Sequence, residues 1–184
     1  MDASTLPPRR GRTITTLAAA AAAAAAVLVG AGVATAEDQP PPEVDRPSGF
    51  EGEVLAPHSA FTDDVQGELE ITYDGGPTLE SDLWDGAETA LVVRVTWQPG
   101  GTSGWHTHPG PAVVTVTEGE VEVTNAVDCV PRTYRQGEAF MDPGQGNVHI
   151  ARNPSDSENA TAYATFLGVP DGEPATVWVE PADC

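Results

Sequence analysis

The chain has 184 residues and a formal net charge of −20. This length suits one domain with appendages. A surface this acidic repels nucleic-acid phosphates and anionic lipid headgroups, so the composition excludes a nucleic-acid-binding protein and favours solubility and an affinity for cations.

The first 36 residues show the order of zones that is typical of a secretory signal peptide. The basic stretch Arg9-Arg10-Gly11-Arg12 precedes an alanine-rich apolar run over residues 17–33, and Ala34-Thr35-Ala36 matches a small-x-small cleavage site. We therefore predict a signal peptide over residues 1–36 and a secreted or extracytoplasmic protein without stable membrane insertion after cleavage. The Arg9-Arg10 pair also raises twin-arginine export. Retention of the apolar run as a membrane anchor is the alternative.

Cleavage would make the protein more acidic and leave two cysteines. Three of the eight basic residues and one of the 28 acidic residues lie in the first 36 positions, so the remaining chain carries a net charge of about −22. In an exported protein the pair Cys129 and Cys184 predicts a disulfide between the C-terminus and an earlier loop. Two free thiols, or one thiol that binds a metal, are the alternatives.

The rest of the chain reads as an all-β domain behind a linker. Residues 37–65, which contain Pro40-Pro41-Pro42, predict a Pro-rich linker and entry segment. Residues 66–184 are predicted to form the barrel domain, since short β-branched or alternating runs are separated by Gly-Pro turns and show no helical period. The predicted strands cover residues 68–73, 90–97, 112–117, 120–124, 138–141, 148–152, 160–167 and 176–179.

Two further expectations concern the turns and the core of this domain. Glu118-Gly119 separates two of the predicted strands and predicts a tight hairpin. Five aromatic residues at strand spacing are predicted to fill the barrel, with Trp105 and Tyr163 favoured to line a pocket. These five are Trp97, Trp105, Phe140, Tyr163 and Phe166.

Histidines are the residues with the clearest chemical signal. In a strand, His106 and His108 would point to the same side, about 6 to 7 Å apart, and could share an ion. His149 in a later strand is the candidate third ligand. Imidazole suits iron, manganese, copper, nickel and zinc, so the identity of the divalent metal stays open. His58, in the polar entry segment, is interpreted as a structural or surface residue.

Two motifs in this region resemble those of the cupin superfamily, here in the form of a small, secreted bacterial single-domain protein. The first has a glycine, paired histidines and a later glycine, and the second has a glycine, a proline, a histidine and an asparagine. The matching residues are Gly100, His106, His108 and Gly119 for the first, and Gly137, Pro143, His149 and Asn153 for the second. The resemblance spans about residues 90–168. It implies a double-stranded β-helix (jelly-roll) barrel with one divalent metal ion inside, bound by His106, His108 and His149.

The chain departs from the family pattern in two places. Ala112 stands where the family's usual glutamate ligand would fall, and an alanine methyl cannot bind a metal. Gln145, Glu138 and Glu118 are the substitutes considered, although Glu118 in a tight turn is expected to be solvated. The segment between Pro143 and His149 is also one residue longer than the common pattern, and we expect residues 144–147 to absorb it as a loop.

The resemblance implies a metal site that is open to a small molecule. One hypothesis is a metal-dependent oxygenase, specifically a dioxygenase, because all-histidine cupin sites often let substrate and dioxygen share the metal. Metal-assisted isomerisation or hydrolysis is a related option. The alternative is a non-catalytic module that binds a small ligand or a metal, since no general base is evident and a fold does not dictate a function. Cupins commonly pair through their sheets, which leaves a homodimer open.

Overall fold

The computed structural model describes residues 44–83 and 89–184, and the predicted signal segment lies outside these ranges. The described residues form strands and loops only, and they contain no helix of the length and apolarity needed to cross a membrane. The strands are β1 Ser48–Ala60, β2 Glu68–Thr72, β3 Thr78–Asp82, β4 Thr89–Thr102, β5 His106–Thr107, β6 Ala112–Glu118, β7 Glu120–Asn125, β8 Pro131–Arg135, β9 Ala139–Asp142, β10 His149–Arg152, β11 Ala160–Leu167 and β12 Val177–Trp178.

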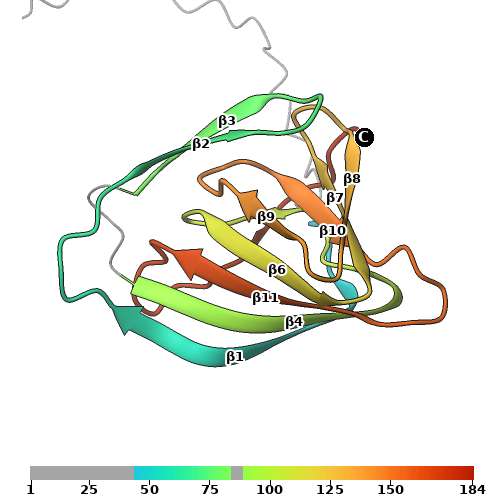
Figure 1. The fold of residues 1–184 in the computed structure, drawn as a ribbon, viewed down its shortest axis with the longest axis horizontal. Helices are drawn as coiled ribbons and strands as arrows, with labels where there is room; N and C mark the ends of the chain where they lie inside the picture. The colour runs from blue at the N-terminus through green and yellow to red at the C-terminus, as the bar shows by residue number, and fades with distance from the viewer. Residues whose placement is uncertain (1–43, 84–88) are drawn as a thin grey trace, which may run out of the picture. The chain divides into compact units, whose positions relative to one another are not determined.

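Ten of these strands form one curved sheet with two layers (Figure 1). One layer has the order β1-β4-β11-β6-β9, and the other has the order β12-β5-β10-β7-β8. The layers are joined where the end of the long strand β4 pairs with β10, at Thr102 and Arg152. Pairings between strands far apart in the sequence curve the sheet into a nearly closed double-stranded β-helix barrel, which confirms the predicted fold class.

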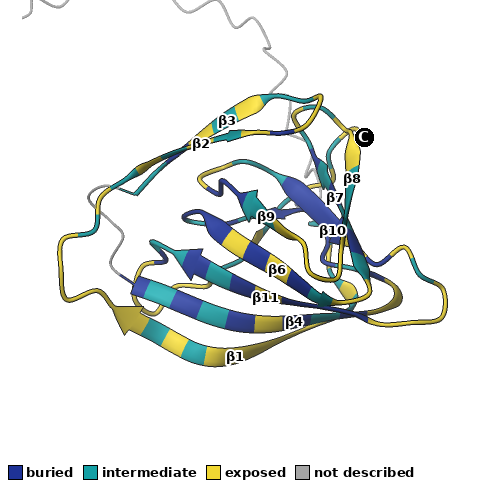
Figure 2. Cartoon of the chain, in the orientation of Figure 1, coloured by how far each residue is buried: buried dark blue, intermediate teal, exposed yellow. Residues whose placement is uncertain are grey.

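The core lies between the two layers because alternate residues of their strands point inward. In β4 the burial alternates along Leu91, Val93, Val95 and Trp97, and in β6 it alternates in the same way (Figure 2). Small side chains of β11, such as Ala162, complete this wall. Strict period-two burial is the pattern of a sheet that covers a core on one face only.

All eight predicted strand segments overlap observed strands, whereas the predicted hairpin at Glu118-Gly119 is wrong. β6 pairs with β11 and β9, and β7 pairs with β10 and β8, so the chain crosses here from one layer to the other. Gly119 adopts a φ of 65°, and a Cβ atom at this position would lie 2.6 Å from the Asn159 carbonyl oxygen. A two-residue connection can therefore join strands of two different layers as well as the two paired strands of a hairpin.

Four observed strands were not among those predicted, and the longest of them is β1. This strand lies in the segment assigned to a linker and entry, and it pairs with β4 from Ser48 to Ala60. Its residues alternate little in burial, because it is the outer strand of its layer. The short pair β2–β3 forms a separate hairpin, and β8 extends the second layer.

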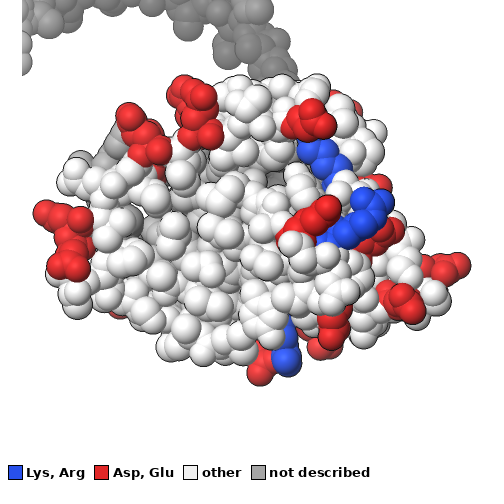
Figure 3. All heavy atoms as spheres, in the orientation of Figure 1, with Lys and Arg blue, Asp and Glu red and all other residues white. Residues whose placement is uncertain are grey.

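The aromatic residues divide between the two sides of the barrel. Trp97, Trp105 and Phe166 are buried, and Phe140 packs against the core. Tyr163 is 39% exposed on the outer side of β11, so its predicted place in the barrel interior is wrong. Figure 3 shows that acidic side chains lie mainly around the edge of this view, while its centre carries few charges.

Candidate metal centre

Three histidines from distant parts of the sequence meet inside the barrel. His106 in β5 is directly paired with His149 in β10, and His108 follows β5 by one residue. The ring centroids lie 4.2 Å apart for His106 and His149, 4.8 Å for His106 and His108, and 5.3 Å for His108 and His149. All three side chains are buried, and one nitrogen from each lies within 4.8 Å of the others. The structure thus brings together the three residues proposed as metal ligands.

Backbone carbonyls orient two of these rings. The Nδ1 of His106 lies 2.7 Å from the Gly104 carbonyl oxygen, and the Nδ1 of His108 lies 2.6 Å from the Ala175 carbonyl oxygen. A carbonyl can only accept, so each Nδ1 donates and each Nε2 keeps its lone pair. Metal-binding histidines characteristically donate their second N–H in this way, which fixes the ring and its tautomer. The rings of His106 and His108 are therefore prepared to bind a cation through Nε2.

The environment also keeps these imidazoles neutral. Burial lowers the pKa of His106 well below its usual value of 6.5, and the neighbouring His149 and His108 lower it further. Burial lowers the pKa of His108 to about 4, although Asp142 acts in the opposite direction. Only neutral imidazole has a free lone pair for a metal, so His106 and His108 are in their binding form at neutral pH.

A fourth polar side chain, Asp142 at the end of β9, reaches the same cluster. Its Oδ2 lies 2.8 Å from His149 Nε2 and 3.4 Å from His108 Nε2, and the carboxylate is almost fully buried. Burial raises the pKa of Asp142, but the two histidines and the Gly144 amide outweigh this effect and hold the pKa below its usual range. Sequence analysis did not name Asp142 as a candidate.

Two buried polar atoms of this cluster have no hydrogen-bond partner among the described residues. They are Asp142 Oδ2, whose contacts with the histidines are close but poorly aligned, and His149 Nδ1. A buried carboxylate oxygen without a donor is costly unless a cation neutralises it. The donor set, its burial and the orphaned oxygen all fit a divalent metal ion.

A family model described as "Cupin domain" matches residues 93–166, which include every side chain of this cluster.

Residues 93–166 are a cupin domain.

Two curated relatives share part of this cupin region. Germin-like protein subfamily 2 member 4 from Arabidopsis thaliana is 33% identical over 79 residues, which cover 41% of this chain and 36% of the relative. Germin-like protein subfamily 2 member 2 from the same plant is 41% identical over 66 residues, which cover 34% of this chain and 30% of the relative. The chain thus spans about a third of the length of the curated relatives it matches.

Solved structures of the cupin type are similar at lower identity. A cupin domain from Bordetella pertussis Tohama I has 20% identity and a TM-score of 0.42, with 66% of this chain and 95% of that chain covered. A conserved protein with a double-stranded β-helix domain from Klebsiella pneumoniae has 22% identity and a TM-score of 0.42, with 50% and 76% covered.

The three side chains considered as substitutes for the missing cupin glutamate form bonds elsewhere. Gln145 accepts from the Asp82 amide at 2.9 Å and donates to the Asp82 carbonyl, outside the cluster. Glu138 accepts from the Arg135 amide at 2.7 Å, and Glu118 accepts from the Thr161 hydroxyl at 3.2 Å. Neither glutamate belongs to the group of three histidines whose candidate ligand atoms all lie within 4.8 Å of one another, and Asp142 also lies outside this group in the described chain.

The longer loop before His149 is absorbed as expected. Gly144, Gln145 and Gly146 have φ values of 60°, 52° and 86°, so three successive residues are left-handed and form a compact turn. Asn147 closes this turn, because its side-chain amide donates to the Gly144 carbonyl at 2.7 Å. His149 consequently enters β10 with its ring directed at the other two histidines.

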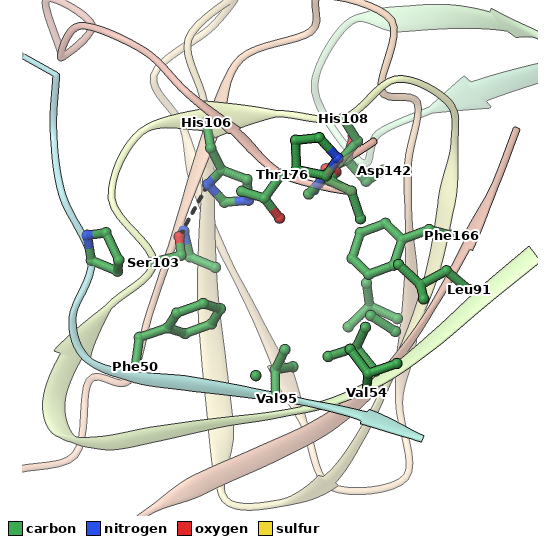
Figure 4. A pocket seen from close by; sticks show the side chains of 18 of the residues that line it. Phe50, Val54, Leu91, Val95, Ser103, His106, His108, Asp142, Phe166 and Thr176 are labelled. Atoms are coloured by element: carbon green, nitrogen blue, oxygen red, sulfur yellow. Dashed lines mark hydrogen bonds and ion pairs between the residues drawn. The ribbon is translucent and has the colours of Figure 1, made fainter. Parts of the chain in front are cut away.

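The cluster of three histidines and Asp142 lies at one end of a cavity of about 640 Å³ (Figure 4). Figure 4 shows His106, His108 and Asp142 on one side and the apolar side chains of Phe50, Val54 and Val95 on the other. His58, interpreted from the sequence as structural, also lines the cavity, and its Nδ1 lies 3.3 Å from the Thr89 hydroxyl. The remaining apolar wall comes from Leu91, Val93, Trp97, Val114, Phe140, Ala164 and Phe166.

Proposed function

We propose that this cupin binds one divalent metal ion through His106, His108 and His149 and presents it to a small molecule held in the cavity. The observation that carries this proposal is the position of the three buried histidines at the end of a cavity of about 640 Å³. This volume lies within the range of ligand pockets, which extends from about 300 to 1,000 Å³.

The chemistry of the cavity indicates the kind of molecule. Its walls are mostly aliphatic and aromatic, and the three histidines with Ser103 and Asp142 are among its polar side chains. A molecule with an apolar body and an oxygen-bearing end would bury its body against residues such as Leu91 and Phe166 and direct its polar end toward the cluster. A divalent ion bound there would polarise that oxygen donor as a Lewis acid.

The reaction class we propose is that of a dioxygenase. Dioxygen would be the oxidant and both of its atoms would enter the product, so no external reductant is required. This chain's residues would hold the substrate, keep bulk water away and leave one side of the three-histidine group accessible. A non-catalytic module that binds a small ligand with the same residues is the alternative.

The proposed place of action is outside the cytoplasm. A disulfide joins Cys129 and Cys184, 55 residues apart, and disulfides persist mainly in oxidising compartments. The signal-like segment over residues 1–36 supports the same proposal from the sequence.

Metal analysis followed by oxygen-uptake assays tests the function. We expect the purified protein to carry about one divalent ion per chain and to consume oxygen with some members of a panel of small phenols and diketones. His106→Ala should lose both metal and oxygen uptake while retaining the β-sheet circular dichroism. His58→Ala, which changes a histidine of the same cavity outside the cluster, should retain the metal.

Two results would count against the proposal in different ways. A wild-type protein that binds none of iron, manganese, nickel, copper or zinc after reconstitution would remove the metal site. A metal-loaded protein that binds members of the panel in calorimetry but never consumes oxygen would be the binding module.

A further inference from the structure

Position 112, where the family's glutamate ligand would fall, carries an alanine, and a carboxylate lies on the strand paired with it. Ala112 in β6 is directly paired with Asp142 in β9. Side chains of directly opposite residues in an antiparallel pair lie on the same face of the sheet, about 5 Å apart at Cβ. Both residues are buried, with 0% exposure for Ala112 and 4% for Asp142. The sheet register thus places the carboxylate of Asp142 beside position 112, where the family pattern has its acidic ligand.

The two oxygens of Asp142 have different surroundings. Oδ1 accepts a hydrogen bond from the Gly144 amide at 2.7 Å, which fixes the orientation of the carboxylate. Oδ2 points to the histidines and has no aligned donor among the described residues. One oxygen therefore orients the group, and the other is free to bind a cation.

The nitrogen that faces Asp142 distinguishes a direct ligand from a residue that only orients a histidine. An orienting carboxylate accepts from the N–H that points away from the metal. In His108 that position is Nδ1, which already donates to the Ala175 carbonyl. Asp142 Oδ2 instead lies 3.4 Å from Nε2, the nitrogen that keeps its lone pair. Two lone pairs directed at each other repel unless a cation lies between them.

The distances from Asp142 to two of the three histidines agree with atoms that share one ion. Metal–ligand bonds of about 2.0–2.2 Å at angles between 90° and the tetrahedral value separate two ligand atoms by about 2.8–3.6 Å. Asp142 Oδ2 lies 2.8 Å from His149 Nε2 and 3.4 Å from His108 Nε2. Both separations fall within that interval.

We propose that Asp142 is the fourth protein ligand of the metal. The family pattern has its acidic ligand at the position of Ala112 in β6, whereas in this chain the acidic ligand lies at the paired position on β9. The inference rests on the metal site of the proposed function. An anionic oxygen beside three imidazoles favours harder ions such as manganese more than an all-imidazole site does. It also reduces the net charge of the occupied site from +2 to +1. A single anionic oxygen donor neutralises a site of +1, so the site favours a substrate with one such donor over a substrate with two.

The first experiment measures Mn²⁺ and Zn²⁺ affinity by competition with a chelator. Asp142→Asn preserves an oxygen that can accept from the Gly144 amide and removes the charge. Loss of a group that only orients a ligand costs about 10–100-fold in metal affinity. We expect Asp142→Asn to lose at least about 100-fold in Mn²⁺ affinity, less in Zn²⁺ affinity, and to change the Mn²⁺ electron paramagnetic resonance spectrum. Glu138→Gln, a nearby exposed carboxylate, should change none of these.

A second variant moves the carboxylate back to β6. Ala112→Glu combined with Asp142→Ala should bind Mn²⁺ at least tenfold more tightly than Asp142→Ala alone, because the acidic group returns to the family's position. A residue that only positions His149 cannot be replaced in this way. If the double variant does not fold, Asp142→Asn decides the question alone.

The outcomes separate this inference from the proposed function. Wild-type metal binding with Asp142→Asn within about threefold of it would overturn the role of Asp142 and leave the three-histidine site in place. A folded double variant that binds no better than Asp142→Ala would also overturn it. A wild-type protein without any metal would overturn both.

Discussion

The matched cupin core and the segments on either side of it contribute different parts of one cavity. The core, residues 93–166, supplies the three histidines, Asp142 and much of the apolar wall. The strand β1 before it supplies Phe50, Val54 and His58, and the C-terminal segment supplies residues 173–176 and Trp178. The core thus holds the candidate metal ligands, while the flanking segments complete the space in which a small molecule would lie.

The flanking segments also support the core's histidines. The Ala175 carbonyl accepts from His108 Nδ1, and Trp178 Nε1 donates to the Ser103 carbonyl at 2.9 Å, beside His106. The two flanks are themselves connected, because the Asp45 amide donates to the Val179 carbonyl at 3.0 Å. A fragment limited to the matched residues would lack one orienting bond and two sides of the cavity.

Removing the disulfide between the core and the C-terminal flank should have the largest effect on stability, because the bond restricts the unfolded chain. The bond closes a loop of 55 residues, for which the chain-entropy model gives roughly 4 kcal/mol. We expect Cys129→Ser combined with Cys184→Ser to lower the free energy of unfolding by about this amount in urea titrations. Reduction of the wild type provides a matched control, since it should give the same loss. A loss below about 1 kcal/mol would contradict the chain-entropy estimate for this loop.

Protonation of His108 in acid should destabilise the metal-free protein by a slightly smaller amount. Burial lowers the pKa of His108 to about 4, against about 6.5 in an unfolded chain. Between these values the unfolded state binds more protons, so stability falls as the pH drops from about 6.5 toward 4. A shift of this size corresponds to about 3 kcal/mol, and the lowered pKa of His106 acts in the same direction. The lowered pKa of Asp142 affects stability only below about pH 4.

Unfolding curves at pH 7, 5.5 and 4.5 measure this dependence. His108→Gln should flatten the dependence, because it removes one of the groups that titrate. A free energy of unfolding that stays constant from pH 7 to 4.5 would contradict a buried, neutral histidine cluster.

The sequence predicted those parts of the site that depend on local spacing. His106 and His108 are two residues apart, and the family motifs supplied His149, so the three-histidine set was available before the fold. The strands of the core were likewise detectable, because β4, β6 and β11 bury alternate residues or carry continuous apolar runs. Such patterns follow from the geometry of a strand that covers a core.

Asp142 was missed because its role depends on a pairing across the sheet. It meets Ala112 only through the register of β9 against β6, and no local rule links positions 30 residues apart. One signal was present, since the alternation along β9 puts Asp142 on the same side as Phe140, which faces the cavity. A charged residue on the apolar face of a strand is unusual and indicates a buried partner. β1 was missed because its alternation in burial is weak.

Trp178→Phe should give the smallest effect and define how closely the C-terminal flank supports the core. The change removes the bond from Trp178 Nε1 to the Ser103 carbonyl and keeps an apolar ring in the cavity wall. Loss of one such hydrogen bond costs about 1 kcal/mol of stability. We expect metal affinity to fall only a few-fold, because the side chains that contact the ion are unchanged, and urea unfolding with chelator competition measures both quantities. Val177→Ala, at a position that is 45% exposed, should change neither. Complete loss of metal in Trp178→Phe would mean that the histidine cluster does not form without the C-terminal flank. The conclusion that the core alone holds the metal ligands would then be wrong.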